Sequence, residues 1–160
     1  GRWVIEEATL GPVPQRAGGP PILIGGMVRA SLERVGRLFD GWFPNAPDPE
    51  RWRAQWDEIR DIAGAAGRDL GQLTGAVYLT MTIDEDRAQA EARMNAFMQN
   101  YYGRTDMRAR QANYAGPAEG AAAWLDAWVR AGVQHMVLRF AGDPAHHLEA
   151  IARLRPQLSG

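Results

Sequence analysis

Short apolar runs alternate with amphipathic stretches along most of this chain. Runs such as ILIGG and HMVLRF are rich in large or β-branched apolar residues, and glycine or polar residues bound them, as is typical of buried strands. Between these runs, apolar residues recur at helical spacing, which indicates helices with one buried face. Strands that alternate with helices predict an α/β fold built on a mostly parallel sheet.

The pattern predicts the element order β-α-β-α-β-α-α-β-α. The predicted strands are 22–26, 40–44, 73–83 and 135–140. The predicted helices are 31–39, 48–67, 84–102, 116–132 and 143–158. Residues 1–19 are dense in proline and glycine and read as an extended connector, with a candidate strand at 3–10, whereas 103–115 show no clear pattern. We expect a single domain over 1–160, with the α/β part at 20–160.

Residue types at the helix ends support these bounds. Asp48 is a predicted N-cap, Pro49 suits the first helical position, and Gly67 is a predicted stop. Asp143 is expected to cap the last helix in the same way. Residues expected on buried helix faces are Leu32, Val35, Leu38 and Phe39, and the pairs Trp52 and Trp56, and Trp124 and Trp128.

The composition narrows the chemistry open to this chain of 160 residues. Its net charge of −1 gives no electrostatic reason for binding nucleic acid or an anionic membrane. It contains no cysteine, and all 18 basic residues are arginine, which excludes disulfides, a cysteine nucleophile, a thiolate metal site and a Schiff-base lysine. No apolar run approaches the roughly 20 residues of a membrane span. We therefore expect a cytoplasmic protein without nucleic-acid or membrane partners.

Ligands of parallel sheets bind at the carboxyl ends of the strands. Three predicted loops lie there: the Gly25–Gly26 turn, the loop 45–49 and the loop 140–144. The glycine pair has two interpretations. It either permits a tight strand-to-helix turn with positive φ, or it lets a phosphate approach backbone N–H groups at a helix start.

Three blocks of the chain occur in an order that characterises one family. The first is PPILIGGMVRASLERVGRLFDGWFP at 20–44, with a strand, the glycine pair, a helix and a DGW sequence. The second is GPAEGAAAWLDAWVRAGVQHMVLRF at 116–140, and PERWRAQWDEIRDIAGAAGRD at 49–69 lies between them. Together they resemble the luciferase-like monooxygenases, which are flavin- or deazaflavin-dependent (β/α)8-barrel oxidoreductases.

The resemblance implies a partial (β/α)8 TIM barrel that contains strands five to eight with their helices. A whole barrel needs about 250 residues, and the family's catalytic residues lie largely on its first four strands. The chain therefore resembles the C-terminal half of a family member, and its catalytic residues stay unknown. A small doubly wound domain of unrelated function is the other fold considered, although the glycine pair lacks dinucleotide-fingerprint spacing.

The resemblance places Gly25 and Gly26 beside the phosphate-bearing side of the cofactor. Ser31 either donates its hydroxyl to that phosphate or is an ordinary residue of the first helical turn. Arg139, near the end of the last strand, either binds that phosphate or points outward to pair with a helix carboxylate. Arg29 is interpreted as solvated. The cofactor is FMN or the deazaflavin coenzyme F420. The loop 45–48 lacks the Thr or Lys that deazaflavin members often use there, which favours FMN.

Other residues with chemical potential have plainer interpretations. Tyr101 and Tyr102 are candidates for the substrate pocket, because the extra helix of this region often borders that pocket in the family. The histidines lack metal-site spacing and are interpreted as structural or exposed: His135, His146 and His147. Asp84 and Glu85 are expected to begin a helix and not to form a catalytic pair.

Two functions remain open at this point. In the first, the chain is the cofactor-phosphate side of a monooxygenase or hydride-transferring oxidoreductase that acts on a small molecule. In the second, it is a non-catalytic half-barrel that forms a homodimer or pairs with a separate N-terminal half. Four barrel strands alone leave sheet edges and an apolar inner face to be covered.

Overall fold

The computed structural model describes residues 11–104 and 106–154. The strands are β1 (Leu23–Ile24), β2 (Gly41–Trp42), β3 (Thr74–Ile83), β4 (Asn113–Gly116) and β5 (His135–Phe140). The α-helices are α1 (Arg29–Leu38), α2 (Pro49–Ala65), α3 (Arg87–Tyr102), α4 (Ala118–Arg130) and α5 (Pro144–Leu154). Two 3₁₀ turns are η1 (Leu70–Gln72) and η2 (Asp106–Ala109). The candidate strand at 3–10 lies outside the described residues.

All strand pairs in the described sheet are parallel. β1 pairs with β2, β2 pairs with the start of β3, and β3 also pairs with β4 and β5. The N–H groups of Thr74 and Tyr78 donate to the carbonyls of Asp40 and Pro44, and the N–H of Thr80 donates to Ala112. These donors lie at even-numbered positions of β3 and therefore point to the same side of that strand. Strands β2 and β4 pair one after the other along this edge of β3, and β5 pairs along its other edge.

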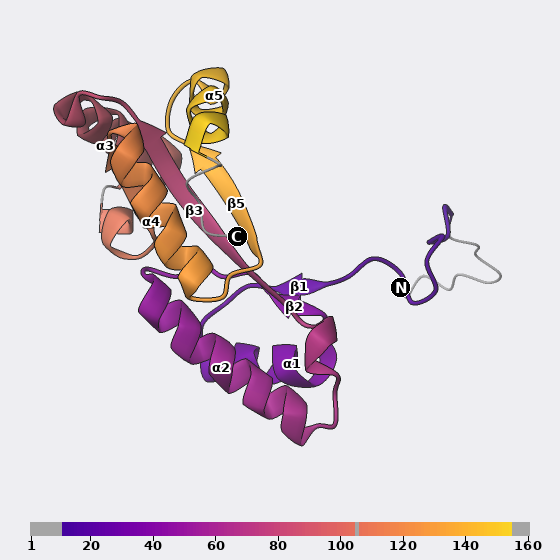
Figure 1. Ribbon diagram of the computed structural model, residues 1–160. Coiled ribbons are helices and arrows are strands. Elements are labelled where there is room, and N and C mark those ends of the chain that lie inside the picture. The colour runs from indigo at the N-terminus through magenta and orange to yellow at the C-terminus, as the bar shows by residue number, and fades with distance from the viewer. Residues whose placement is uncertain (1–10, 105, 155–160) are drawn as a thin grey trace, which may run out of the picture.

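The two faces of β3 have different surroundings. Val77, Leu79 and Met81 are fully buried in the main hydrophobic core. Helix α2 contributes Trp52 to this core, and its indole N–H donates to the carbonyl of Ala76 at 3.0 Å. In Figure 1, α1 and α2 lie near one end of β3, and α3 and α5 lie toward the other. Residues of α1, α2, α4 and α5 pack in the main core and cover one face of the sheet, whereas α3 packs in a second cluster with Ala115 and Ala141.

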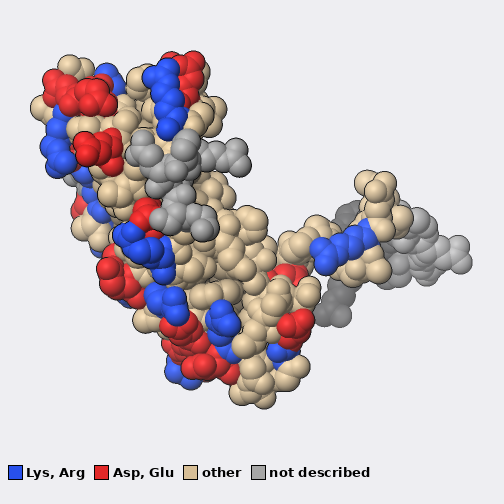
Figure 2. Space-filling view, in the orientation of Figure 1, with Lys and Arg blue, Asp and Glu red and all other residues tan. Residues whose placement is uncertain are grey.

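The opposite face is only partly covered. Its side chains include Phe43, Tyr78, Val137 and Arg139, which we call the open face. Phe43 and Tyr78 are in edge-to-face ring contact at 5.8 Å, and Val137, which pairs in register with Tyr78, is 45% exposed. Figure 2 shows charges of both signs over the helices on the visible side of the molecule. This sheet therefore exposes apolar surface that a closed barrel would bury.

Helix starts follow the local sequence. The Asp48 carboxylate accepts a hydrogen bond from the backbone N–H of Arg51 at 2.7 Å, and Pro49 begins α2, as predicted. Asp143 accepts one from Ala145 at 3.0 Å before α5. The predicted start of α3 at Asp84 is wrong by three residues. Asp86 caps this helix, because its carboxylate accepts the N–H groups of Ala88 and Gln89.

Two further expectations are wrong for reasons of tertiary packing. Leu38 is 72% exposed, because α1 turns Val35 and Gly36 toward α2, where a Cβ on Gly36 would lie 2.7 Å from Ile62 Cγ2. The stretch 103–115 contains most of β4, which adds a strand to the predicted order. Its sequence NYAG lacks a strand pattern, and pairing with the end of β3 creates it.

Candidate functional site

The carboxyl ends of β1 and β2 lie side by side, because these two strands pair in parallel. The Gly25–Gly26 turn follows β1, and the backbone N–H of Phe43 beyond β2 donates to the carbonyl of Ile24 at 3.0 Å. Asp84 and Gly142 lie further along the sheet, because β2 pairs only with the first residues of β3, whereas β5 pairs with β3 as far as Met81. Ligands of α/β folds bind at the carboxyl ends of strands, so the turn after β1 is the candidate site.

The glycine turn after β1 has a fixed and side-chain-free backbone. Gly26 has φ +95°, and a Cβ there would lie 2.8 Å from Ser31 Oγ. The carbonyl of Gly26 accepts the indole N–H of Trp42 at 2.8 Å, and the carbonyl of Met27 accepts the amide of Gln55 at 2.8 Å. The side chains of Trp42 and Gln55 thus hold the turn, and its positive φ favours glycine.

The turn leads into a helix start that has no side-chain cap. Val28 occupies the N-cap position of α1 without a side-chain hydrogen bond. The first-turn N–H groups of a helix lack intrahelical acceptors and favour anions. Ser31 lies against Gly26, so these two predicted site residues are together. Arg29 is exposed and forms ion pairs with Glu33 and Glu58, at 3.1 and 2.8 Å.

The loop after β2 serves structure in two ways. Ala46 is buried, and its carbonyl accepts the backbone N–H of Ala112 at 2.9 Å, which joins β2 to β4. Asp48 caps α2. Asn45 is exposed and remains available to a ligand.

Arg139 lies in a different part of the sheet from the glycine turn. Its guanidinium donates to Thr80 Oγ1 from Nε at 3.1 Å and from Nη2 at 2.7 Å. Four rings surround it at centroid distances of 4.8 to 5.4 Å: Tyr78, Phe97, Tyr101 and Tyr102. Arg139 forms no ion pair among the described residues. The alternative prediction, that it pairs with a carboxylate on a helix, is therefore wrong for these residues.

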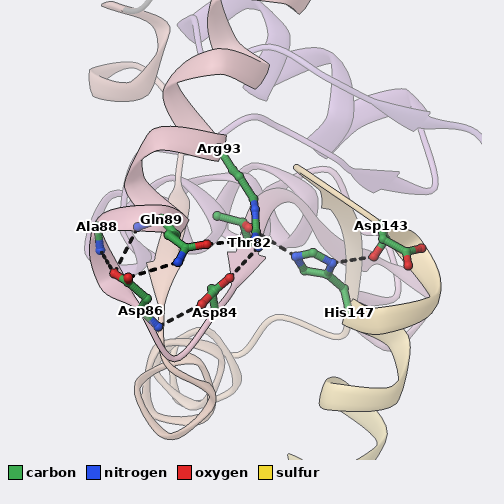
Figure 3. A network of polar contacts seen from close by, with 8 residues as sticks. All are labelled: Thr82, Asp84, Asp86, Ala88, Gln89, Arg93, Asp143 and His147. Atoms are coloured by element: carbon green, nitrogen blue, oxygen red, sulfur yellow. Dashed lines mark hydrogen bonds and ion pairs between the residues drawn. The ribbon is translucent and has the colours of Figure 1, made fainter.

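A polar network occupies the ends of β3 and β5 (Figure 3). His147 is 1% exposed; its Nδ1–H donates to the carbonyl of Asp143 at 2.6 Å, and its Nε2 is hydrogen-bonded to the Thr82 hydroxyl at 3.3 Å. Both ring nitrogens therefore have protein partners, and His147 has a structural role. Asp84 accepts the backbone N–H of Asp86 and pairs with Arg93 at 2.6 Å.

The displaced pKa values here have structural causes. The backbone N–H of Gln89, its side-chain amide and the N–H of Ala88 lower the pKa of the Asp86 carboxyl. Burial raises the pKa of the Tyr114 phenol, whose O–H donates to the carbonyl of Pro117 at 2.6 Å. Neither group has the geometry of a general acid or base.

Other expectations concern metals, membranes and the tryptophans. Among residues 11–104 and 106–154, no group of three or more His, Asp or Glu side chains is placed to hold a metal ion. No helix of the described chain is long and apolar enough to cross a membrane. Trp52, Trp56 and Trp128 are buried, and Trp124 packs against the main core, as predicted.

The sequence profile of the family described as luciferase-like monooxygenase matches residues 2–158, nearly the whole chain. This chain belongs to the luciferase-like monooxygenase family. Its profile match agrees with the three sequence blocks that carried the resemblance.

One curated relative and two solved structures illustrate the likeness. The 5,10-methylenetetrahydromethanopterin reductase of Methanolobus tindarius is 34% identical over 77 residues, which cover 48% of this chain and 24% of the reductase. An F420-dependent secondary alcohol dehydrogenase in complex with an F420–acetone adduct has a TM-score of 0.73 and 16% identity, over 88% of this chain and 49% of that one. Riboflavin lyase (RcaE) with modified FMN and riboflavin has a TM-score of 0.68 and 14% identity, over 89% and 44%.

At these identities the solved structures show the fold alone. This luciferase-like chain therefore shares a parallel α/β architecture with them and spans less than half of each of these two structures. The assignment of Gly25, Gly26, Ser31 and Arg139 to a cofactor stays a prediction. Sequence reasoning did not connect Tyr78 or Phe97 with Arg139, although the same-face spacing of Tyr78 and Thr80 on β3 was a usable signal.

Proposed function

We propose that this chain forms the cofactor-phosphate side of a flavin- or deazaflavin-dependent oxidoreductase that acts on a small molecule. Family membership supports this proposal, as do relatives named for F420 or solved with a modified FMN. The observation that carries it is the uncapped start of α1, which directly follows the Gly25–Gly26 turn at the carboxyl edge of the sheet. We also propose residues 20–160 as the limits of the α/β domain that contains this site.

The residues at this turn fit a phosphate group. A Cβ on Gly26 would occupy space next to Ser31 Oγ, so glycine keeps the backbone N–H groups accessible. The N–H of Ser31 donates to the carbonyl of Val28 at 2.8 Å, so the N–H groups of Arg29 and Ala30 are the donors of the first turn, at the positive end of the helix dipole. Ser31 adds a hydroxyl that can donate to a phosphate oxygen. Arg29 is held by two carboxylates and adds little to this site.

The cofactor, when bound, supplies the redox chemistry: FMN supports oxygen insertion, and the deazaflavin supports hydride transfer. The chain's own residues bind and orient the cofactor. The turn at Gly26 anchors the phosphate, and the neighbouring ring of Phe43, which follows β2, provides apolar surface for a planar ring. The same apolar surface keeps water away from the ring. We assign no general acid or base to the described residues.

We further propose that β1, β2, β3 and β5 correspond to strands five to eight of a (β/α)8 barrel. The alternation of parallel strands and helices, and the likeness to about half of each solved relative, support this correspondence. On this proposal the open face is the inner face of the barrel. The activity of the whole protein then needs residues beyond the described ones.

A titration tests the phosphate assignment. FMN, riboflavin and coenzyme F420 are added to the purified chain, and binding is followed by fluorescence. Riboflavin lacks the phosphate, so FMN should bind more tightly, and Ser31→Ala should lower FMN affinity while leaving riboflavin unchanged. Gly64→Ala, an open position in α2, is the matched control. Equal binding of FMN and riboflavin by the unaltered chain would contradict a phosphate site at this turn.

The exposed open face favours a second candidate, a half-barrel that associates with a second copy or with a complementary half. Val137 is 45% exposed and Tyr101 62%, and neighbouring Phe43 and Tyr78 are only partly covered. Light scattering over a range of concentrations tests this candidate, with Val137→Glu as the disrupting variant. A dimer that Val137→Glu dissociates would support association through this face. A monomer at all concentrations would reject self-association.

A further inference from the structure

Arg139 presents a cation that the described residues leave without a counter-charge. It belongs to β5 and lies on the open face, where its guanidinium meets aromatic rings and the Thr80 hydroxyl. Only Nε and Nη2 have protein acceptors among the described hydrogen bonds. A guanidinium carries five N–H donors in a planar fork, so its Nη1 group is free for a ligand.

The rings around Arg139 hold one another in place. Phe97 and Tyr101 stack at 5.5 Å, and Tyr101 meets Tyr102 edge to face at 4.7 Å. The Tyr102 hydroxyl donates to Gln111 Oε1 at 3.3 Å. The guanidinium is therefore fixed in position before any ligand arrives, which lowers the entropic cost of binding.

This position is separated from the glycine turn. Between β1 and β5 lie β2 and β3, and three strand spacings amount to about 14 Å across the sheet. A single phosphate bound at Gly26 and Ser31 cannot also reach a guanidinium at that separation. This separation favours a ligand of its own for Arg139, whose assignment to the cofactor phosphate stays a prediction.

We propose that Arg139 binds an oxyanion of the substrate, and that the substrate is a small carboxylate with a planar apolar part. This inference rests on the proposed function, since it takes the glycine turn to hold the cofactor. A carboxylate matches the planar donor edge of a guanidinium. The exposed ring of Tyr101 and the partly covered ring of Tyr78 offer faces for the apolar part.

Benzoate is the probe, and benzyl alcohol is its uncharged counterpart. Calorimetric titration of the full chain at low salt should detect benzoate and not benzyl alcohol. Arg139→Met should weaken benzoate binding by about tenfold to a hundredfold, the range expected for a charge-assisted contact. It should leave FMN affinity unchanged. Arg153→Met removes an exposed arginine that pairs with Glu149 on α5, and it should change neither.

The outcomes separate the proposals. Loss of FMN affinity in Arg139→Met with benzoate unaffected would return Arg139 to the cofactor phosphate and overturn the inference. Absence of benzoate binding by the unaltered chain would overturn it too. Failure of FMN and F420 to bind, with benzoate binding intact and dependent on Arg139, would reject the proposed function alone. If Arg139→Met does not fold, Arg139→Lys serves instead: it keeps the charge, loses the planar fork, and should retain weaker benzoate binding.

Discussion

The glycine turn after β1 allows a sharp test of the structural reasoning. Gly26 has φ +95°, and an added Cβ would lie 2.8 Å from Ser31 Oγ and 3.3 Å from Ser31 Cβ. A side chain held at positive φ costs about 1–3 kcal/mol. At this chain length, each 1 kcal/mol lowers the melting temperature by roughly 2–4 °C. We therefore expect Gly26→Ala to unfold several degrees below the unaltered chain.

The matched control is Gly64→Ala. Gly64 lies inside α2, and its added Cβ would meet no atom within 4 Å. Alanine there should stabilise the chain by about 0.5–1 kcal/mol, because it is the better helix former. The two variants should thus differ by at least about 1.5 kcal/mol in the free energy of unfolding, measured by urea denaturation.

A second substitution separates the two parts of the cost at Gly26. Ser31→Gly removes the atoms that the new Cβ would meet, so in the double variant the steric part should disappear while the cost of positive φ remains. Equal stability of Gly26→Ala and Gly64→Ala would refute the left-handed turn. The same result would contradict the argument that glycine keeps this backbone open to a phosphate.

Two other predictions concern stability. In urea unfolding, Trp52→Phe should destabilise the chain by about 1 kcal/mol more than Trp128→Phe. The Trp52 substitution leaves the carbonyl of Ala76 without its donor, whereas the buried indole N–H of Trp128 has no acceptor to lose. Similar losses in both variants would contradict this comparison. Hydrogen bonds, chiefly from Gln89, lower the pKa of Asp86 in the folded state. The ionised Asp86 therefore stabilises the fold above its unfolded pKa of about 3.8, and this contribution is lost as the pH falls through the lower folded pKa. The urea midpoint of Asp86→Asn should therefore decline less below pH 3.8 than that of the unaltered chain; parallel pH curves would exclude this role.

Local sequence signals predicted most elements of this fold. The capping carboxylate of Asp48 and the following Pro49 define the start of α2 within a few residues, since both act through neighbouring backbone groups. The strand at 73–83 is apparent from its β-branched and apolar residues and is observed at Thr74–Ile83. In contrast, β4 exists only because residues 113–116 pair with the end of β3, and nothing in NYAG signals that partner.

By itself, the sequence determined the alternation of strands and helices, the parallel class of the sheet, the caps of α2 and α5, and the glycine turn. These features depend on backbone preferences and on residues within a few positions of one another. Tertiary structure alone decided that Leu38 is exposed and that Arg139 meets Thr80, 59 residues away, inside an aromatic cage. Strand register and the placement of α3 set those contacts, and both depend on packing between distant segments that no local pattern encodes.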